Sequence, residues 1–167
     1  SPGAPIAYKL NYLQDNSPAR MSFTTDYDVK ECVRVSQKVK VTLNSIAVED
    51  AGGDPGDDLE IYGRIWAEGT TSGALFDKST SNAVTIREGQ QFGTGGALAE
   101  TVISVSPRAG ESIRLRGDLR ESDLLRDDSL GNETQSNPFE TGWRKESTMI
   151  LTGAGARVKI SFSLSPI

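Results

Sequence analysis

The sequence predicts an all-β domain that folds as an antiparallel β-sandwich. Short segments that alternate apolar and polar residues recur along nearly the whole chain of 167 residues, as expected for strands with one face on a core and one in water. Clusters of Gly, Pro, Asp and Ser separate these segments and are typical of turns. No segment keeps a helical period over three turns. This spacing favours two packed antiparallel sheets.

The expected strands follow from these alternations in chain order. They are residues 39–48, 59–67, 82–88, 100–106, 111–119, 147–153 and 156–165. In the first strand the apolar face shifts after Ser45, which indicates a β-bulge. In the second, Leu59 and Ile61 lie on one face and Trp66 on the other. Because such tryptophans are usually buried, we expect Trp66 in the core.

The remaining segments are expected to be loops. Residues 67–81 and 89–99 are rich in Gly, Ser and Thr, whereas residues 120–146 form a long charged connection that contains Asn-Pro. Long connections in compact domains are more often functional than idle. We therefore look for binding residues in these three segments.

The composition excludes several classes of function. Histidine is absent and Cys32 is the single cysteine, which excludes a histidine-assisted nucleophile, an internal disulfide and a zinc site. The role of Cys32 stays open. The net charge is −5 and no basic stripe suits nucleic acid. No apolar run is long enough for a membrane-spanning helix. We expect a binding protein rather than an enzyme.

The acidic residues are concentrated in two stretches. Residues 49–60 hold six acidic residues and no basic one, and residues 118–128 hold five acidic and two basic residues. Asp-rich and Gly-rich runs are common at solvated turns. Calcium, however, takes six to eight oxygen ligands, which two acidic loops at one end of a sandwich can supply. An EF-hand is the weaker alternative for the first stretch, because a loop numbered from Asp50 places Gly52 at position three, Pro55 at the required glycine and Ile61 at the bidentate acid.

Residues 5–29 read PIAYKLNYLQDNSPARMSFTTDYDV, an alternating strand, a turn and a second alternating strand. This segment resembles the thiol-activated, cholesterol-dependent cytolysins, in the long strands that lead toward their membrane-binding terminal domain. The tryptophan-rich loop with a cysteine that follows in that family has no counterpart after Cys32, so cholesterol recognition is not carried over. The resemblance implies a β-hairpin segment at residues 1–37 and a different binding module at residues 38–167. It also implies a secreted or cell-surface protein whose parent forms pores and self-associates there.

The two acidic stretches are also similar in outline to the calcium-binding loops of C2 domains, which are β-sandwiches; an immunoglobulin-like sandwich is the alternative. Residues 53–65 would supply the first loop and residues 115–132 the second. Two departures are clear: Glu121-Ser122-Asp123 stands where Asp-x-Asp is usual, and the first loop lacks Asp-Pro-Tyr. The candidate calcium ligands are Asp54, Asp57, Asp58, Glu121, Asp123 and Asp128.

Four aromatic residues lie in the expected loops and are candidates for contact with a membrane or ligand. They are Phe76, Phe92, Phe139 and Trp143. Aromatic side chains in loops suit lipid headgroups or sugars. The sequence therefore predicts a module that targets a pore-forming, cytolysin-like protein to membrane lipid or to a cell-surface receptor, with calcium as the candidate ion. The alternative is an ion-independent module that binds a protein or a glycan.

Overall fold

A computed structural model describes residues 36–53, 57–106, 111–123, 127–138 and 143–167. The strands are β1 (Gln37–Ala51), β2 (Asp58–Glu68), β3 (Ser72–Lys78), β4 (Val84–Arg87), β5 (Gln91–Phe92), β6 (Ala99–Val105), β7 (Ser112–Glu121), β8 (Asp128–Pro138), β9 (Lys145–Gly153) and β10 (Ala156–Pro166). A short 3-10 helix, η1 (Thr80–Asn82), precedes β4. The all-β prediction is confirmed.

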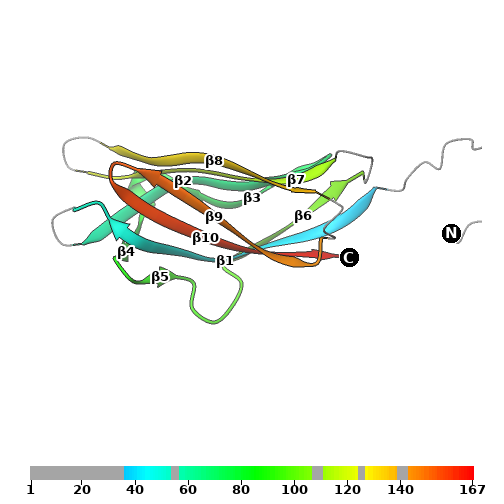
Figure 1. Ribbon diagram of the computed structural model, residues 1–167, viewed down its shortest axis with the longest axis horizontal. Coiled ribbons are helices and arrows are strands. Elements are labelled where there is room, and N and C mark those ends of the chain that lie inside the picture. Colours follow the sequence, from blue (N-terminus) through cyan, green and yellow to red (C-terminus); the bar gives the residue numbers. More distant parts are fainter. Residues whose placement is uncertain (1–35, 54–56, 107–110, 124–126, 139–142) are drawn as a thin grey trace, which may run out of the picture. The chain divides into compact units, whose positions relative to one another are not determined.

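The strands form two antiparallel sheets that face each other (Figure 1). Sheet A has the order β5-β1-β10-β9, and β6 pairs with the other half of β1. Sheet B has the order β3-β2-β7-β8, and β4 pairs with the first residues of β2. The prediction of an antiparallel sandwich is therefore confirmed.

The core lies between the sheets and is built by the predicted alternation. In β10, Val158, Ile160 and Phe162 are fully buried, and the residues between them are partly exposed. The bulge predicted in β1 is confirmed, because the register with β10 shifts between Leu43 and Ser45. The extra residue returns the later apolar residues of β1 to the core side.

The edge strands of the two sheets also approach each other. At one edge, the N–H groups of Thr70 and Thr71, in the turn before β3, donate to the carbonyl oxygen of Ser104 in β6, at 2.8 and 3.3 Å. At the other edge, a Cβ atom on Gly153 of β9 would collide with the carbonyl oxygen of Ser129 in β8. Glycine thus permits a close approach that a side chain would prevent.

The loop predictions were wrong in three places. Part of residues 120–146 is the long strand β8, and the Gly-rich segments contain β3 and β5. The strand expected at residues 82–88 is shorter, because η1 precedes it. β8 pairs with β7 along ten residues but buries few side chains. Its strand structure comes from backbone pairing with the preceding strand β7, which a local apolar pattern does not reveal.

The predicted domain boundary lies next to the first residue of β1, Gln37. Residues 1–35, which include the cytolysin-like segment and Cys32, lie outside the described residues. The division into segments 1–37 and 38–167 stays a prediction. In the described part of the chain, no helix has the length and apolarity to cross a membrane.

Candidate functional site

The first acidic segment connects β1 to β2, and Glu88 contacts its two described ends. The N–H of Ala51 donates to Glu88 Oε2 at 3.0 Å, and the N–H of Glu88 donates to the carbonyl oxygen of Asp57 at 2.7 Å. Glu88 thereby joins the two ends of the segment to the turn after β4. Asp57 and Asp58 are exposed, so their carboxylates are open to solvent. Asp54 lies outside the described residues.

The second acidic segment connects β7 to β8. Glu121 is buried at 7% exposure, whereas Asp123 is exposed and Asp128 is half-buried. Asp127, which the sequence analysis did not select, accepts a hydrogen bond from the Tyr62 hydroxyl at 2.7 Å. Its other carboxylate oxygen accepts the N–H of Asp123 at 3.4 Å. Asp127 therefore ties this segment to β2.

The hydrogen bond to Asp127 raises the pKa of Tyr62 above its ordinary value. The main cause is that the carboxylate accepts the phenolic proton, which favours the protonated tyrosine, and partial desolvation and the negative charge act in the same direction. Arg120 opposes them. No pattern of spacing in the sequence indicates this pair, because its members are 65 residues apart.

The fold brings the two acidic segments to the same end of the sandwich. β2 begins where its neighbour β7 ends: Ile61 pairs with Glu121, and the N–H of Ser122 donates to the carbonyl oxygen of Glu60 at 2.9 Å. Continuing this pairing places Asp123 beside the start of β2, where Asp58 lies. In Figure 1 the end of β1 and the starts of β2 and β8 lie at the left end. The described ends of the two acidic segments therefore lie at the same end of the sandwich, and the proximity of their carboxylates stays a prediction.

Convergence alone does not make a calcium site. Among the residues that the structure describes, no group of three or more acidic, histidine or cysteine side chains is arranged to hold a metal ion. Calcium binding by these carboxylates therefore stays a prediction.

Two of the four aromatic residues proposed for membrane or ligand contact lie in the core instead. Phe76 is 6% exposed on β3, and Trp143 is 1% exposed. The Trp143 indole N–H donates to the carbonyl oxygen of Asn137 at 3.2 Å, which holds the ring inside. A contact role for either residue was wrong. Phe92 is 37% exposed on β5 and stays a candidate, and Phe139 lies outside the described residues.

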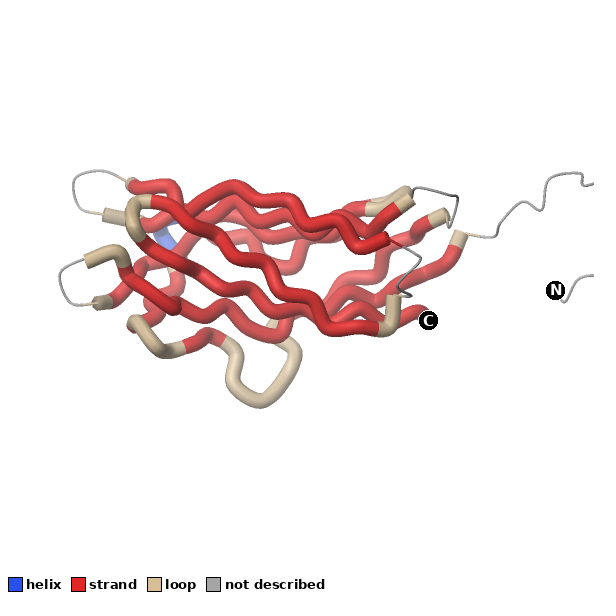
Figure 2. Tube along the Cα trace, viewed as in Figure 1, coloured by secondary structure: helices blue, strands red, loops and turns tan. Residues whose placement is uncertain are grey.

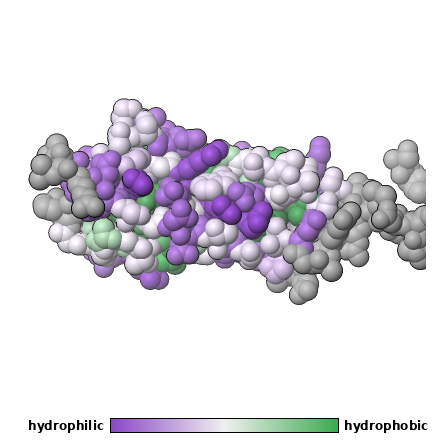
Figure 3. Space-filling view, turned by 90° about the horizontal axis from the view of Figure 1, so that it is seen from above, coloured by the Kyte–Doolittle hydropathy of each residue, from purple (hydrophilic) through white to green (hydrophobic). Residues whose placement is uncertain are grey.

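Trp66, by contrast, is not in the core but on the outer face of sheet B. Its ring lies 5.5 Å from the Arg64 guanidinium carbon and 5.9 Å from that of Arg116, and its N–H donates to Glu68 at 2.7 Å. Arg114 and Arg116 also pair with Glu68. From the side of β8 and β2, Figure 3 shows mostly hydrophilic side chains over the described surface. On this outer face, Arg64 and Arg116 make cation–π contacts with the Trp66 ring.

No family model matches the chain, and no curated protein matches it. The resemblance to cytolysins therefore rests on residues 5–29 alone. Similar solved structures include a chain of the Cry23Aa1 and Cry37Aa1 binary protein complex, with a TM-score of 0.46 and 22% identity over 78% of this chain and 99% of that chain. Another holds two C2 domains of extended synaptotagmin 2, with a TM-score of 0.47 and 13% identity; the match covers 96% of this chain and 48% of that chain. A further C2 domain has a TM-score of 0.38 and 12% identity, and the match covers 77% of this chain and 98% of that chain.

Proposed function

We propose that residues 38–167 form a non-catalytic module that targets a secreted, cytolysin-like protein to a membrane, with calcium bound at the acidic end of the sandwich. One observation carries the proposal: β2, β7 and β8 bring two acidic segments to the same end. The N-terminal resemblance supports the cytolysin-like parent. Nothing in the composition supports catalysis, since histidine is absent.

The electrostatics explain what an ion would do there. Asp57, Asp58 and Asp123 carry like charges at one end of the molecule, and like charges in proximity repel. A calcium ion that binds two or more of these carboxylates relieves the repulsion and leaves coordination positions open. Phosphate oxygens of lipid headgroups are suitable ligands for those positions. The expected lipid surface is therefore anionic.

Liposome sedimentation of the whole chain tests the proposal. The lipids are phosphatidylcholine alone and a mixture with phosphatidylserine, each with about 1 mM calcium, the range of extracellular sites, or with EGTA. We expect calcium-dependent binding to the anionic liposomes that Asp58→Asn and Asp123→Asn weaken. Glu133→Gln is the control, because Glu133 is an exposed acid in the middle of β8. Phe92→Ala should weaken binding without changing its calcium dependence.

The outcomes separate the parts of the proposal. Equal binding in calcium and EGTA contradicts the role of the ion, and no binding under any condition contradicts membrane targeting. Thermal unfolding gives a second measurement, since a ligand that binds only the folded state stabilises it by about 0.4 kcal/mol at its dissociation constant and by about 2.7 kcal/mol at a hundred times that concentration. An unchanged melting temperature at millimolar calcium would exclude the calcium site.

A second candidate function is ion-independent binding of a cell-surface protein or glycan. The observation that favours it is the Tyr62–Asp127 hydrogen bond of 2.7 Å, which gives one carboxylate of the acidic end a partner without an ion. Cell binding by the labelled chain in EGTA tests this function. Loss of binding after protease treatment of the cells would identify a protein receptor, and loss after glycosidase treatment would identify a glycan. Absence of binding in EGTA would exclude this function.

A further inference from the structure

Two adjacent shallow hollows lie where β5 and the loop after it pack against β1. Their volumes are about 360 and 240 Å³, and Gln91 lines both. The larger is lined by Asn44, Ser45, Gln91, Gly93, Gly95, Gly96 and Ala97. Residues 89–99 carry no charged side chain, in a chain in which a quarter of the residues are charged. Uncharged donors and acceptors therefore dominate this surface.

The loop that borders the larger hollow projects from the sandwich but is attached at both ends. In Figure 2 it is the tan loop that projects downward below the strands. At one end, Gly93 has φ +93°, and a Cβ atom there would lie 2.6 Å from the carbonyl oxygen of Asn44, so glycine is needed. At the other end, the N–H of Leu98 donates to the carbonyl oxygen of Leu43 at 2.8 Å. The wall of the hollow is thus built onto the bulge of β1.

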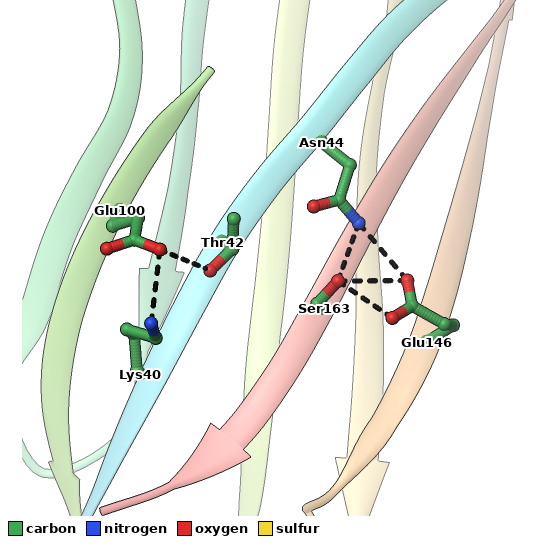
Figure 4. A network of polar contacts seen from close by, with 6 residues as sticks. All are labelled: Lys40, Thr42, Asn44, Glu100, Glu146 and Ser163. Carbon is green, nitrogen blue, oxygen red and sulfur yellow. Dashed lines mark hydrogen bonds and ion pairs between the residues drawn. The ribbon is translucent and has the colours of Figure 1, made fainter. Parts of the chain in front are cut away.

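The Asn44 side chain is oriented before any ligand binds. Its amide nitrogen donates to Ser163 Oγ at 2.6 Å and to Glu146 Oε2 at 3.1 Å, and Ser163 also donates to Glu146 (Figure 4). Because a carboxylate only accepts hydrogen bonds, the amide nitrogen must face Glu146. The amide oxygen of Asn44 points away from both partners (Figure 4). Asn44 lines the larger hollow, and these hydrogen bonds hold its amide in one orientation there.

Gln91 supplies a second amide between the two hollows. It is exposed and pairs with Ala47 of β1, which places it beside the outer face of sheet A. Its nitrogen donates to the carbonyl oxygen of Gly93 at 3.2 Å, and that bond uses one of the two amide protons. The amide oxygen and the second proton remain for a ligand.

The residues that line the hollows offer no cation to an anionic ligand. Glu49 is the charged residue of the smaller hollow, and the two basic side chains beside it, Arg157 at 2.7 Å and Lys159 at 4.0 Å, are both paired with Glu49. No lysine or arginine lines either hollow among the described residues. The apolar lining atoms come from small residues and Val48, which offer little area to an apolar ligand.

We propose that these hollows bind a neutral glycan. Sugar hydroxyls both donate and accept, which matches two side-chain amides, the hydroxyls of Ser45 and Thr94, and glycine backbone that a ligand can approach closely. The proposal rests on the ion-independent function described above and gives it a site and a ligand class. It uses none of the carboxylates at the acidic end.

A glycan array read in EGTA tests this proposal with the whole chain. The array holds neutral, sialylated and sulfated oligosaccharides, and calorimetric titration follows with the neutral oligosaccharide bound best. We expect binding to neutral glycans, weakened about tenfold by Gln91→Ala, the equivalent of one or two hydrogen bonds. Gly96→Trp should abolish binding by filling the larger hollow, because Gly96 has open space around it. Glu133→Gln should bind normally.

Three results would overturn the proposal: no neutral glycan bound, preference for sialylated or sulfated glycans, or unchanged affinity in both hollow variants. Circular dichroism and the melting temperature establish that each variant is folded. Liposomes free of glycolipid are tested separately, so failure of the glycan site is distinguishable from failure of membrane targeting. Protease-sensitive cell binding with an unreactive array would keep the ion-independent function and exclude the glycan.

Discussion

Replacing Asn137 should destabilise the sandwich although the residue lies far from any charge of the acidic end. Asn137 is fully buried in β8, and its amide oxygen accepts the Ser147 hydroxyl at 3.1 Å. Its amide nitrogen faces the carbonyl oxygen of Ile113 at 3.5 Å, the outer limit of a hydrogen bond. In Asn137→Ala, the Ser147 hydroxyl, itself 7% exposed, loses its acceptor. A buried unsatisfied polar group costs about 1–3 kcal/mol, so we expect a loss of about 2 kcal/mol.

Urea and thermal unfolding measure this loss. For a domain of this size, 2 kcal/mol corresponds to a fall in melting temperature of about 8 °C. Ser147→Ala should cost less, and a double-mutant cycle should give a coupling energy of about 1 kcal/mol, because both changes remove the same bond. Asn132→Ala, at an exposed position of the same strand, should change stability by less than about 0.5 kcal/mol. Additive effects, or an Asn137→Ala variant as stable as the wild type, would refute the reasoning.

Two further predictions concern contacts between distant strands. Because the pKa of Tyr62 is raised in the folded state, its bond to Asp127 should stabilise the protein below the unfolded tyrosine pKa of about 10 and lose this effect as pH rises through the folded pKa. Ultraviolet titration of the wild type minus Tyr62→Phe should report the raised pKa, and Asp127→Asn should return it toward the ordinary value; an unchanged titration would contradict the contact. Gly153→Ala should cost about 1–3 kcal/mol by forcing β9 away from the backbone of β8. Its control, Gly96→Ala, meets no atom within 4 Å and should be neutral in thermal unfolding; equal stability of the two variants would contradict the close approach.

The sequence was sufficient where each strand carries its own apolar pattern. β2 and β10 alternate cleanly, and in both strands the alternating apolar positions are the buried ones. The bulge in β1 was predictable because Ile46 and Val48 change parity relative to Leu43, and only an extra residue keeps all three in the core.

The sequence was insufficient where a strand depends on its neighbours. β8 reads DSLGNETQSNP, which resembles a loop, and its structure comes from the ladder with β7. Phe76 is buried because β3 pairs with β2. Trp66 lies on the face opposite Leu59 and Ile61, as the alternation indicated. It is half-buried on the outer face rather than in the core, because Arg116 on β7 supplies a partner there that spacing does not reveal.

The candidate site was predictable in its composition but not in its arrangement. The acidic segments were visible in the sequence. Their placement at one end of the sandwich depends on the pairing of β2 with β7, and more than forty residues separate these two strands in the sequence. The Tyr62–Asp127 bond is equally non-local. The amide-lined hollows beside β1 had no signal beyond the absence of charge in residues 89–99.

The close approach of the sheet edges limits how this protein can meet other molecules. An open edge offers unpaired backbone groups that can recruit a strand from another chain. Here the turn before β3 hydrogen-bonds to β6, and β8 packs against β9 through glycine. An incoming strand would have to displace those contacts first. Binding of a partner strand at these edges is therefore disfavoured, and so is edge-to-edge aggregation at high concentration. The side chains on the faces and ends of the sandwich are then the surfaces that determine binding specificity.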